Sequence, residues 1–282
     1  MSVEHTREFH FTTQDFQLIR KLIYEHAGIS LSESKQELAY SRLARRLRAT
    51  GVKTFAEYLN RLQRGDEAEW QAFTNSLTTN LTSFFREAHH FPTLAEHLRK
   101  LDKAHPAVLW CSACSTGEEA YSMAMTAVDA FGGFDHPVRI IASDLDTEVL
   151  QTARLGRYKL ESIARMSVQQ IDKFFVRGKG EDAGFVQVRP ELQKIINFRR
   201  INLLDATWPI REQLDAIFCR NVMIYFDKDT QLEILRKFAL LLRGDGLLFA
   251  GHSESFYHAD AYFKLRGHTV YELAARLKAT RM

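Results

Sequence analysis

The feature that most constrains the fold is a change of rhythm near residue 105, after which short apolar segments alternate with a helical one. Val108–Cys111 and Val138–Ala142 are short runs rich in aliphatic side chains, and a helical pattern spans about residues 118–131 between them. A strand, a helix and a second strand in this order form a βαβ unit, which implies a parallel sheet with right-handed crossovers. The second part of the chain is therefore predicted to be an α/β domain.

Further β-rich runs extend the predicted sheet. They are Ile195–Leu203, Asp215–Cys219, Gly246–Ala250, Phe263–Leu265 and Thr269–Leu273. The three-residue connection between the last two predicts a hairpin, so the sheet is expected to end in an antiparallel strand. Between about residues 172 and 194, two runs of alternating hydrophobicity flank a glycine-rich turn. They predict a small antiparallel β-subdomain inserted into the α/β domain.

The first hundred residues show helical periodicity and no convincing strand pattern. One helix is expected to begin at Asp15 and end near Gly28, and another to span about residues 34–50 and stop at Gly51. The predicted organisation is an all-helical N-terminal domain over residues 1–90, a linker helix to about residue 104, and the α/β domain over residues 105–282.

The helix predicted at residues 34–50 carries an excess of basic side chains. Arg42, Arg45 and Arg46 are spaced so that they share one helix surface. Such a strip is either a solvated face or a docking surface for an acidic partner, which could be a helical protein or a nucleic acid. The sequence of this helix alone does not decide between these interpretations.

Composition places the chain among ordinary soluble globular proteins. Lys and Arg total 38 against 35 Asp and Glu, a net charge of +3, which argues against a nucleic-acid coat over the whole chain. Three cysteines are too few for a disulfide framework. The N-terminus lacks the pattern of a signal peptide, and no apolar run approaches the roughly 18–20 residues that span a bilayer. We therefore expect a cytoplasmic protein without membrane insertion.

The loop after the first predicted strand differs from a dinucleotide-binding loop. It holds one glycine, Gly117, where that motif has three, and places Glu118 and Glu119 at the start of the helix. These carboxylates either favour a cationic ligand over a pyrophosphate or only complement the helix dipole. After the second strand, Asp144 is the candidate for ribose hydroxyls and Asp146 for capping the next helix. An adenosine-bearing ligand with a positive tail indicates S-adenosylmethionine.

Two other motifs lack the residues that would complete a catalytic or metal site. Cys111 and Cys114 have a spacing found in zinc and redox sites, yet the chain offers no second ligand pair and Cys111 is expected within a strand. Gly251–Ser255 resembles a nucleophile elbow without its second glycine. Buried cysteines without a metal are the favoured interpretation, and a hydrolase is disfavoured.

Six motifs occur in order along the chain. They are NLTSFFRE at 80–87, STGEEAYS at 115–122, ASDLDTEVL at 142–150, INLLD at 201–205, DAIFCRNVMIYF at 215–226 and LLFAGHSESF at 247–256. Together they resemble the chemotaxis receptor methyltransferases of the CheR type, over essentially the whole chain. The resemblance implies a helical domain followed by a Rossmann-like class I methyltransferase domain with an inserted β-subdomain. It also implies methyl transfer from S-adenosylmethionine to receptor glutamates in chemotaxis adaptation, with S-adenosylhomocysteine as the product.

The resemblance further implies roles for individual residues. The implied cofactor-binding residues are Asn80, Thr82, Arg86, Gly117, Glu119, Asp144, Asn202, Leu203, Arg220 and Asn221. Arg86 and Tyr225 are implied to act in catalysis, by orienting the incoming carboxylate or the methionine end of the cofactor. If a helix follows Asn80, Thr82 and Arg86 lie on one of its faces.

For partners, the resemblance implies methyl-accepting chemoreceptors. Arg42, Arg45 and Arg46 would then dock acidic methylation helices. The β-subdomain near Arg177–Arg189 resembles the subtype that binds a receptor C-terminal pentapeptide by strand addition. A monomer without nucleic-acid binding is expected. Two alternatives stay open: an RNA methyltransferase whose basic helix contacts phosphate, and a regulator that binds S-adenosylmethionine without turnover.

Overall fold

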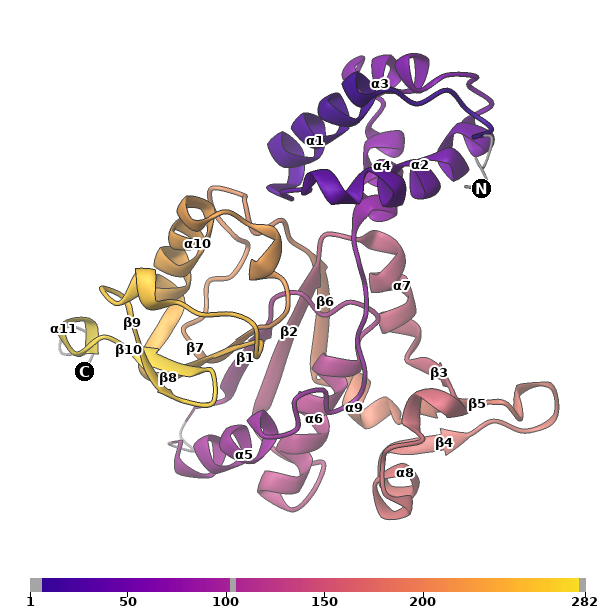
Figure 1. Cartoon of the computed structure of the whole chain (residues 1–282). Helices are drawn as coiled ribbons and strands as arrows, with labels where there is room; N and C mark the ends of the chain where they lie inside the picture. Colours follow the sequence, from indigo (N-terminus) through magenta and orange to yellow (C-terminus); the bar gives the residue numbers. More distant parts are fainter. Residues whose placement is uncertain (1–6, 102–104, 279–282) are drawn as a thin grey trace, which may run out of the picture. The chain divides into compact units, whose positions relative to one another are not determined.

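The computed structural model describes residues 7–101 and 105–278, and the chain divides into two compact units (Figure 1). The first unit comprises residues 1–79 together with the short segment Tyr225–Asp227. The second comprises residues 80–224 and 228–282. Over the described ranges, no helix is long and apolar enough to cross a membrane.

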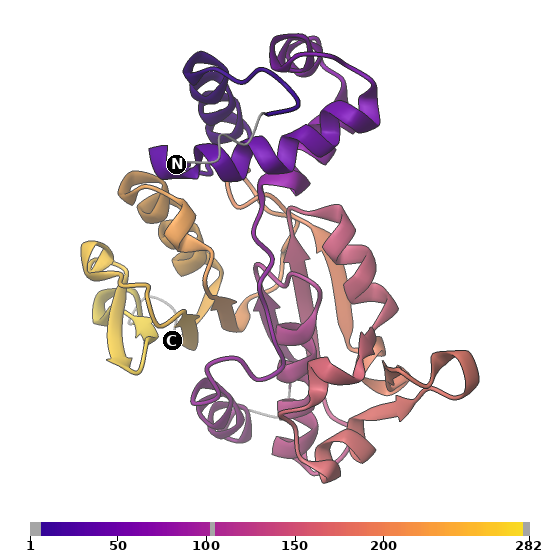
Figure 2. The same ribbon diagram turned by 45° about the vertical axis from the view of Figure 1, so that its right-hand side comes forward.

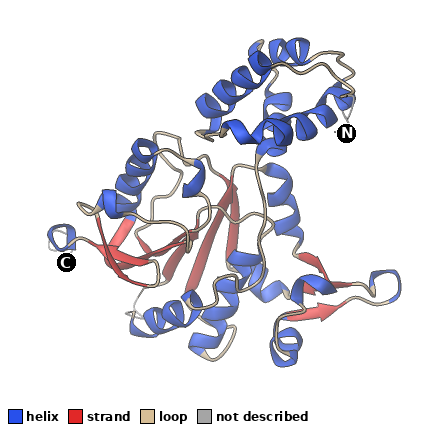
Figure 3. Ribbon diagram, viewed as in Figure 1, coloured by secondary structure: helices blue, strands red, loops and turns tan. Residues whose placement is uncertain are grey.

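The first unit is helical, and its described residues form no strand (Figure 3). Its helices are α1 (Thr13–Ala27), η1 (Glu33–Lys35), α2 (Gln36–Thr50), α3 (Phe55–Gln63) and α4 (Glu67–Leu77). Thr12 and Asp15 form a capping box at the start of α1, and Gly28 ends this helix in the left-handed conformation. Both helices expected from the sequence are confirmed, and α1 begins two residues before Asp15.

The second unit contains a seven-stranded sheet in the order β6-β2-β1-β7-β8-β10-β9. Its strands are β1 (Ala107–Cys111), β2 (Val138–Asp144), β6 (Ile196–Arg200), β7 (Leu214–Cys219), β8 (Leu242–Ala250), β9 (Phe263–Gly267) and β10 (Val270–Leu273). Strands β6, β2, β1, β7 and β8 pair in parallel, whereas β10 runs antiparallel to both of its neighbours. The predicted mostly parallel sheet with an antiparallel last strand is confirmed.

Helices cover both faces of the central strands. β1 and β7 are buried at every position, as a parallel strand between two layers must be. α6 (Glu118–Phe131) and α7 (Thr147–Leu155) contact β2, α5 (His90–Lys100) packs on α6, and α10 (Lys228–Leu241) connects β7 to β8 (Figure 2). The C-terminal helix α11 (Ala275–Lys278) follows β10. The crossovers through these helices are the βαβ arrangement that the alternating pattern predicts.

A second, three-stranded antiparallel sheet is inserted between β2 and β6, and it projects from the large sheet in both views (Figures 1 and 2). Its elements are β3 (Arg157–Lys159), η2 (Leu160–Ile163), α8 (Val168–Phe174), β4 (Phe175–Arg177), η3 (Gly180–Asp182) and β5 (Phe185–Val188), and α9 (Pro190–Lys194) follows them. The predicted hairpin is confirmed as β4 and β5. β3 was not predicted, because three residues are too few for an alternating pattern to be recognised in the sequence.

Candidate active site

The order of the large sheet reverses between β1 and β7, because the chain runs outward from β1 to β2 on one side and later returns to β7 on the other. Ligands of open α/β sheets bind at such a point, outside the carboxyl ends of the strands. The loops that begin at Ser112 after β1, at Leu145 after β2 and at Arg220 after β7 meet this description. Five of the predicted cofactor residues lie in these loops or at the element ends that border them, namely Gly117, Glu119, Asp144, Arg220 and Asn221.

Asp144 is the last residue of β2, and its carboxylate faces the loop that follows β1. It accepts the N–H of Ser115 at 2.8 Å and the N–H of Asp146 at 3.0 Å. Asp146 caps α7, as predicted, and its second oxygen accepts a hydrogen bond from Asn80 Nδ2 at 2.8 Å. Burial raises the pKa of Asp144 to about 6, although the two N–H donors oppose that shift. The predicted ribose acceptor is thus a fixed carboxylate at the carboxyl end of the parallel strands.

Gly117 lies where the loop after β1 enters α6. Its φ is +101°, and an added Cβ would lie 2.9 Å from both Ala153 Cβ and Tyr158 Oη. Residues other than glycine are therefore excluded at this position by the backbone conformation and by the lack of space. The close approach packs the start of α6 against its neighbours and so fixes the position of the carboxylates that follow Gly117.

Arg220, the first residue after β7, is fully buried and surrounded by oxygen atoms. Its guanidinium lies 2.9 Å from a carboxylate oxygen of Glu119 and 3.4 Å from one of Glu87, and it also donates to the backbone carbonyl of Arg86. Glu119 accepts a further hydrogen bond from Cys111 Sγ at 3.1 Å. Burial raises the pKa of Glu119, and the charge of Arg220 partly offsets this. One buried cation therefore faces two largely buried carboxyl groups.

Glu87 links this cluster to the loop after β8. One of its oxygens lies 3.0 Å from His252 Nδ1 and accepts from Asn221 Nδ2 at 3.3 Å. Although burial acts to raise it, the hydrogen bond of His252 and the charge of Arg220 lower the pKa of Glu87 to about 2. Glu87 is thus an ionised carboxylate that holds three separate segments together.

The same carboxylate belongs to a group with metal-ligand geometry. Glu87, His89 and His90 place one ligand atom each within 4.8 Å of one another. The guanidinium of Arg220 lies 3.4 Å from Glu87 and would repel a divalent ion bound there. We therefore assign Glu87 to the arginine cluster and not to a metal centre.

Unusual backbone conformations concentrate in these loops. The described non-glycine residues with positive φ are Phe85, Glu87, Ser115, Asn221, His268 and Thr269. The last two form the turn between β9 and β10, Ser115 and Asn221 lie in the loops after β1 and β7, and Phe85 and Glu87 lie in the segment before α5. A left-handed conformation costs a non-glycine residue roughly 1–3 kcal/mol, and such positions are typical of binding sites.

The expectation that Thr82 and Arg86 share a helix face is wrong. Residues 78–89 contain no helix, and α5 begins only at His90. The positive φ values at Phe85 and Glu87 are incompatible with a right-handed helix there. Instead the segment loops back on itself, and Arg86 donates to the carbonyl of Leu81 at 2.8 Å.

The residues predicted after the third and fourth parallel strands lie in turns. Asn202 accepts the N–H of Leu204 at 3.0 Å through its side chain, and this turn explains why β6 ends at Arg200 and not at Leu203. Leu203 is buried. Tyr225 belongs to the first unit, where its carbonyl accepts the N–H of Ser30 at 2.8 Å, whereas Arg86 belongs to the second unit.

The three arginines of the predicted docking strip differ in their surroundings. Arg46 donates twice to Glu69, at 3.0 and 2.8 Å, and Arg42 donates to the carbonyl of Thr78 at 2.5 Å. Arg45 is exposed and forms no ion pair within the described part of the chain. The strip therefore offers one arginine with a fully available guanidinium.

Three site residues were missed by sequence reasoning about individual motifs, namely Glu87, Glu254 and His252. Glu87 and Glu254 stand inside segments that the family resemblance matched, but neither segment has a pattern that predicts its contacts. Their partners lie 134 and 33 residues away along the chain, at Asn221. Only the strand order brings these loops together.

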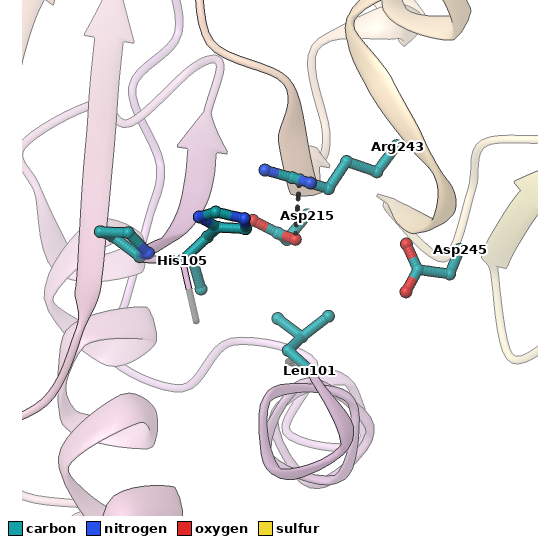
Figure 4. A pocket seen from close by; sticks show the side chains of 7 residues that line it. Leu101, His105, Asp215, Arg243 and Asp245 are labelled. Carbon is teal, nitrogen blue, oxygen red and sulfur yellow. Dashed lines mark ion pairs between the residues drawn. The ribbon is translucent and has the colours of Figure 1, made fainter. Parts of the chain in front are cut away.

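The opposite, amino-terminal end of the same strands contains a separate pocket. It is lined by Leu101, His105, Pro106, Ala107, Asp215, Arg243 and Asp245 (Figure 4). Asp215 accepts the N–H of Val108 at 2.7 Å and pairs with Arg243 at 3.2 Å. Because Asp215 lies near the start of β7, this buried carboxylate is remote from the loops at the carboxyl ends.

Comparisons with known proteins agree with this arrangement. The family model described as CheR methyltransferase, SAM binding domain, matches residues 80–272, and the one described as CheR methyltransferase, all-alpha domain, matches residues 14–78. The chain is 53% identical over 269 residues to chemotaxis protein methyltransferase 2 of Pseudomonas aeruginosa, covering 95% of this chain and 96% of that protein. It is 50% identical over 273 residues to the chemotaxis protein methyltransferase of Escherichia coli, covering 96% and 95%.

Proposed function

The chain belongs to the CheR methyltransferase family, and on that premise we propose that it methylates glutamate side chains of chemoreceptors. It is a methyltransferase of chemotaxis that uses S-adenosylmethionine. The proposed acceptors are carboxylates on the cytoplasmic helices of a receptor, which become methyl esters while S-adenosylhomocysteine is released. The observation that carries the proposal is the excess of buried carboxyl groups over cations around Arg220, at the point where the sheet order reverses.

The residues of this site fit S-adenosylmethionine. Asp144 presents a carboxylate at the end of β2, where ribose hydroxyls are bound in folds of this class. Glu119 and Glu87 place two carboxyl groups beside the single guanidinium of Arg220, which suits a ligand with a sulfonium and an ammonium group. A pyrophosphate would be repelled at the same place.

We assign the remaining cofactor contacts as follows. Asn80, Thr82 and Arg86 act from the segment before α5, and Gly117 permits close approach of the loop after β1. Asn202 and Leu203 would hold the adenine end of the cofactor, and Asn221 would act beside Arg220 at its methionine end.

The chemistry asks this chain for positioning and not for proton transfer. When bound, the cofactor supplies an electrophilic methyl group. A glutamate side chain has a pKa of about 4.3 and is already ionised at neutral pH, so no general base is needed. Arg86 and Tyr225 orient the incoming carboxylate or the methionine end of the cofactor, and correct orientation is worth up to about 7–11 kcal/mol in favourable cases.

Two surfaces of the chain are proposed to dock the receptor. On α2, the strip of Arg42, Arg45 and Arg46 is proposed to bind acidic methylation helices. Arg45 has an available charge, whereas Arg42 and Arg46 also form hydrogen bonds within the helical unit. The hairpin of β4 and β5 is proposed to add a receptor C-terminal pentapeptide as an extra strand. A Cβ at Gly178 would collide with the backbone carbonyl of Asp182, so this turn needs glycine. We propose that the protein acts as a cytoplasmic monomer.

The test is transfer of labelled methyl groups from S-adenosylmethionine to receptor-containing membranes. We expect label in the receptor that base releases as methanol, as an ester requires, and strong loss of transfer with Arg86→Ala at saturating cofactor. Label in RNA with a steep salt dependence would instead support an RNA methyltransferase. Binding of the cofactor without any transfer would support a regulator.

The proposed binding of a receptor C-terminal pentapeptide, here called the tether, has its own test. This test is titration of that peptide against the chain. We expect binding that Gly178→Ala abolishes, because the added Cβ would distort the turn. The same variant is expected to methylate a receptor without this tail at the normal rate. Absence of peptide binding to the unaltered chain at high micromolar concentration would contradict the tether but not the transfer reaction.

A further inference from the structure

The loop after β7 is held by one buried carboxylate from the loop after β8. Glu254 is 5% exposed. One of its oxygens accepts the backbone N–H groups of Asn221 and Gly251 at 2.9 and 2.5 Å, and the other accepts those of Val222 and Met223 at 3.0 and 2.8 Å. Four backbone donors that would otherwise lack a partner thus converge on a single side chain.

The two loops are in direct contact at this point. A Cβ added to Gly251 would lie 2.5 Å from Asn221 Nδ2 and 2.9 Å from its backbone nitrogen. Asn221 itself has a φ of 58°, a conformation that a free loop would rarely hold. The carboxylate of Glu254 compensates this strained backbone, because three of its four hydrogen bonds go to residues 221–223.

The same loop carries two side chains that we assign to the cofactor. Arg220 faces Glu119 and Glu87, and Asn221 donates to Glu87 at 3.3 Å. Glu254 therefore fixes the backbone of this loop from one side while Glu87 holds its side chains from the other. Among the described residues, Asn221 is the one predicted cofactor residue that forms a hydrogen bond with Glu254, and it does so through its backbone N–H.

We propose that Glu254 is a positioning residue for cofactor binding, which holds residues 221–223 so that Arg220 and Asn221 present their side chains to the methionine end of S-adenosylmethionine. This inference rests on the proposed function for the identity of the ligand. It requires a group that accepts four hydrogen bonds, which a carboxylate does and an amide does not, because the amide nitrogen is a donor.

The decisive variant is Glu254→Gln, in which two of the four N–H groups would face an NH₂ group. We expect the Kd for S-adenosylhomocysteine, measured by calorimetry on the folded protein, to rise about tenfold or more. The KM for S-adenosylmethionine should rise with it, with a smaller effect on kcat. Hydrogen exchange of the amides of residues 221–223 should accelerate in the ligand-free protein.

The matched control is Asp215→Asn, which alters another buried carboxylate that accepts a backbone N–H, at the opposite end of the sheet. It is expected to lower stability and to leave the Kd within about twofold. If Glu254→Gln does not fold, Glu254→Asp keeps the acceptor oxygens one methylene short, and a Kd raised about threefold or more is expected.

A purely structural role would lower the melting temperature of the Glu254 variants without changing the Kd or the local exchange, and this result would overturn the inference. Failure of the proposed function is distinguishable. If the unaltered chain binds S-adenosylhomocysteine but transfers no methyl group to a receptor, the acceptor assignment fails, while the affinity and exchange data still decide the role of Glu254.

Discussion

Each unit of the molecule contains an arginine that pairs with buried glutamate, and the two clusters are balanced differently. In the helical unit, Arg46 donates two hydrogen bonds to Glu69, which also accepts one from Tyr58 at 2.7 Å. In the sheet unit, Arg220 faces both Glu87 and Glu119. The first cluster is neutral, with one cation and one carboxylate, whereas the second has an additional carboxyl group.

This difference separates a structural ion pair from a binding site. Burying an uncompensated charge is costly. A neutral cluster such as that of Arg46 has no uncompensated charge and needs no ligand to balance it. The cluster of Arg220 has two carboxyl groups for one arginine, so the second carboxyl group can pair with a cationic ligand. The segments around this cluster also hold four of the non-glycine residues with positive φ, whereas no non-glycine residue in the described part of the helical unit has a positive φ.

Replacing Arg220 is expected to have the largest effect. Arg220→Met leaves Glu87 and Glu119 without their shared cation, and removal of one partner from a buried ion pair costs about 3–5 kcal/mol. We expect that loss in the free energy of unfolding from denaturant titration, and no measurable S-adenosylhomocysteine binding by calorimetry. Arg220→Met combined with Glu119→Gln should regain part of the stability but none of the binding. Normal affinity in either variant would remove the distinction between the two clusters.

A smaller effect is expected when the neutral cluster is broken. Arg46→Met should lower the free energy of unfolding by about 1–3 kcal/mol, because Glu69 is 5% exposed but keeps its hydrogen bond from Tyr58. The Kd for S-adenosylhomocysteine should stay within about twofold. Replacing both partners, Arg46→Met with Glu69→Leu, should bring stability close to that of the unaltered chain. A large loss of cofactor affinity in Arg46→Met would contradict a purely structural role.

The fold was predictable because apolar periodicity reports burial directly. β1 and β7 are buried at every position and read as continuous apolar runs, so the parallel sheet followed from the sequence. β3 has one buried residue and was missed, and β6 ends early because Asn202 forms a turn. Short elements and turn geometry depend on neighbours that a local pattern does not contain.

The candidate site was predictable only in part. Asp144 ends β2 and Glu119 lies at the start of the helix that follows β1, so their position at the carboxyl end of the sheet could be expected from the sequence. The contacts of Glu87 with Arg220 depend on loops from distant segments. Likewise Arg45 and Arg46 are adjacent basic residues on α2, and only the position of Glu69, 23 residues further along, determines which of them is committed to an ion pair.

The smallest expected effect is the dependence of stability and ligand affinity on pH that comes from Asp144. The pKa of Asp144 is raised to about 6 by burial, against roughly 3.9 in an unfolded chain. Its protonated form is therefore favoured on folding, so this contribution to stability is complete below about pH 4 and is lost as the pH rises through 6. Ligand affinity has the opposite sign, because ribose hydroxyls donate to the ionised carboxylate.

We expect S-adenosylhomocysteine to bind about tenfold more weakly at pH 5 than at neutral pH, since a group with a pKa of about 6 is then roughly nine-tenths protonated. Calorimetric titrations across this range measure the change. Asp144→Asn is the control, because an amide does not titrate there, and it should bind weakly with a much flatter pH profile. An equally steep profile in Asp144→Asn would assign the dependence to another carboxyl group, of which Glu119, whose pKa is also raised by burial, is the nearest candidate in the Arg220 cluster.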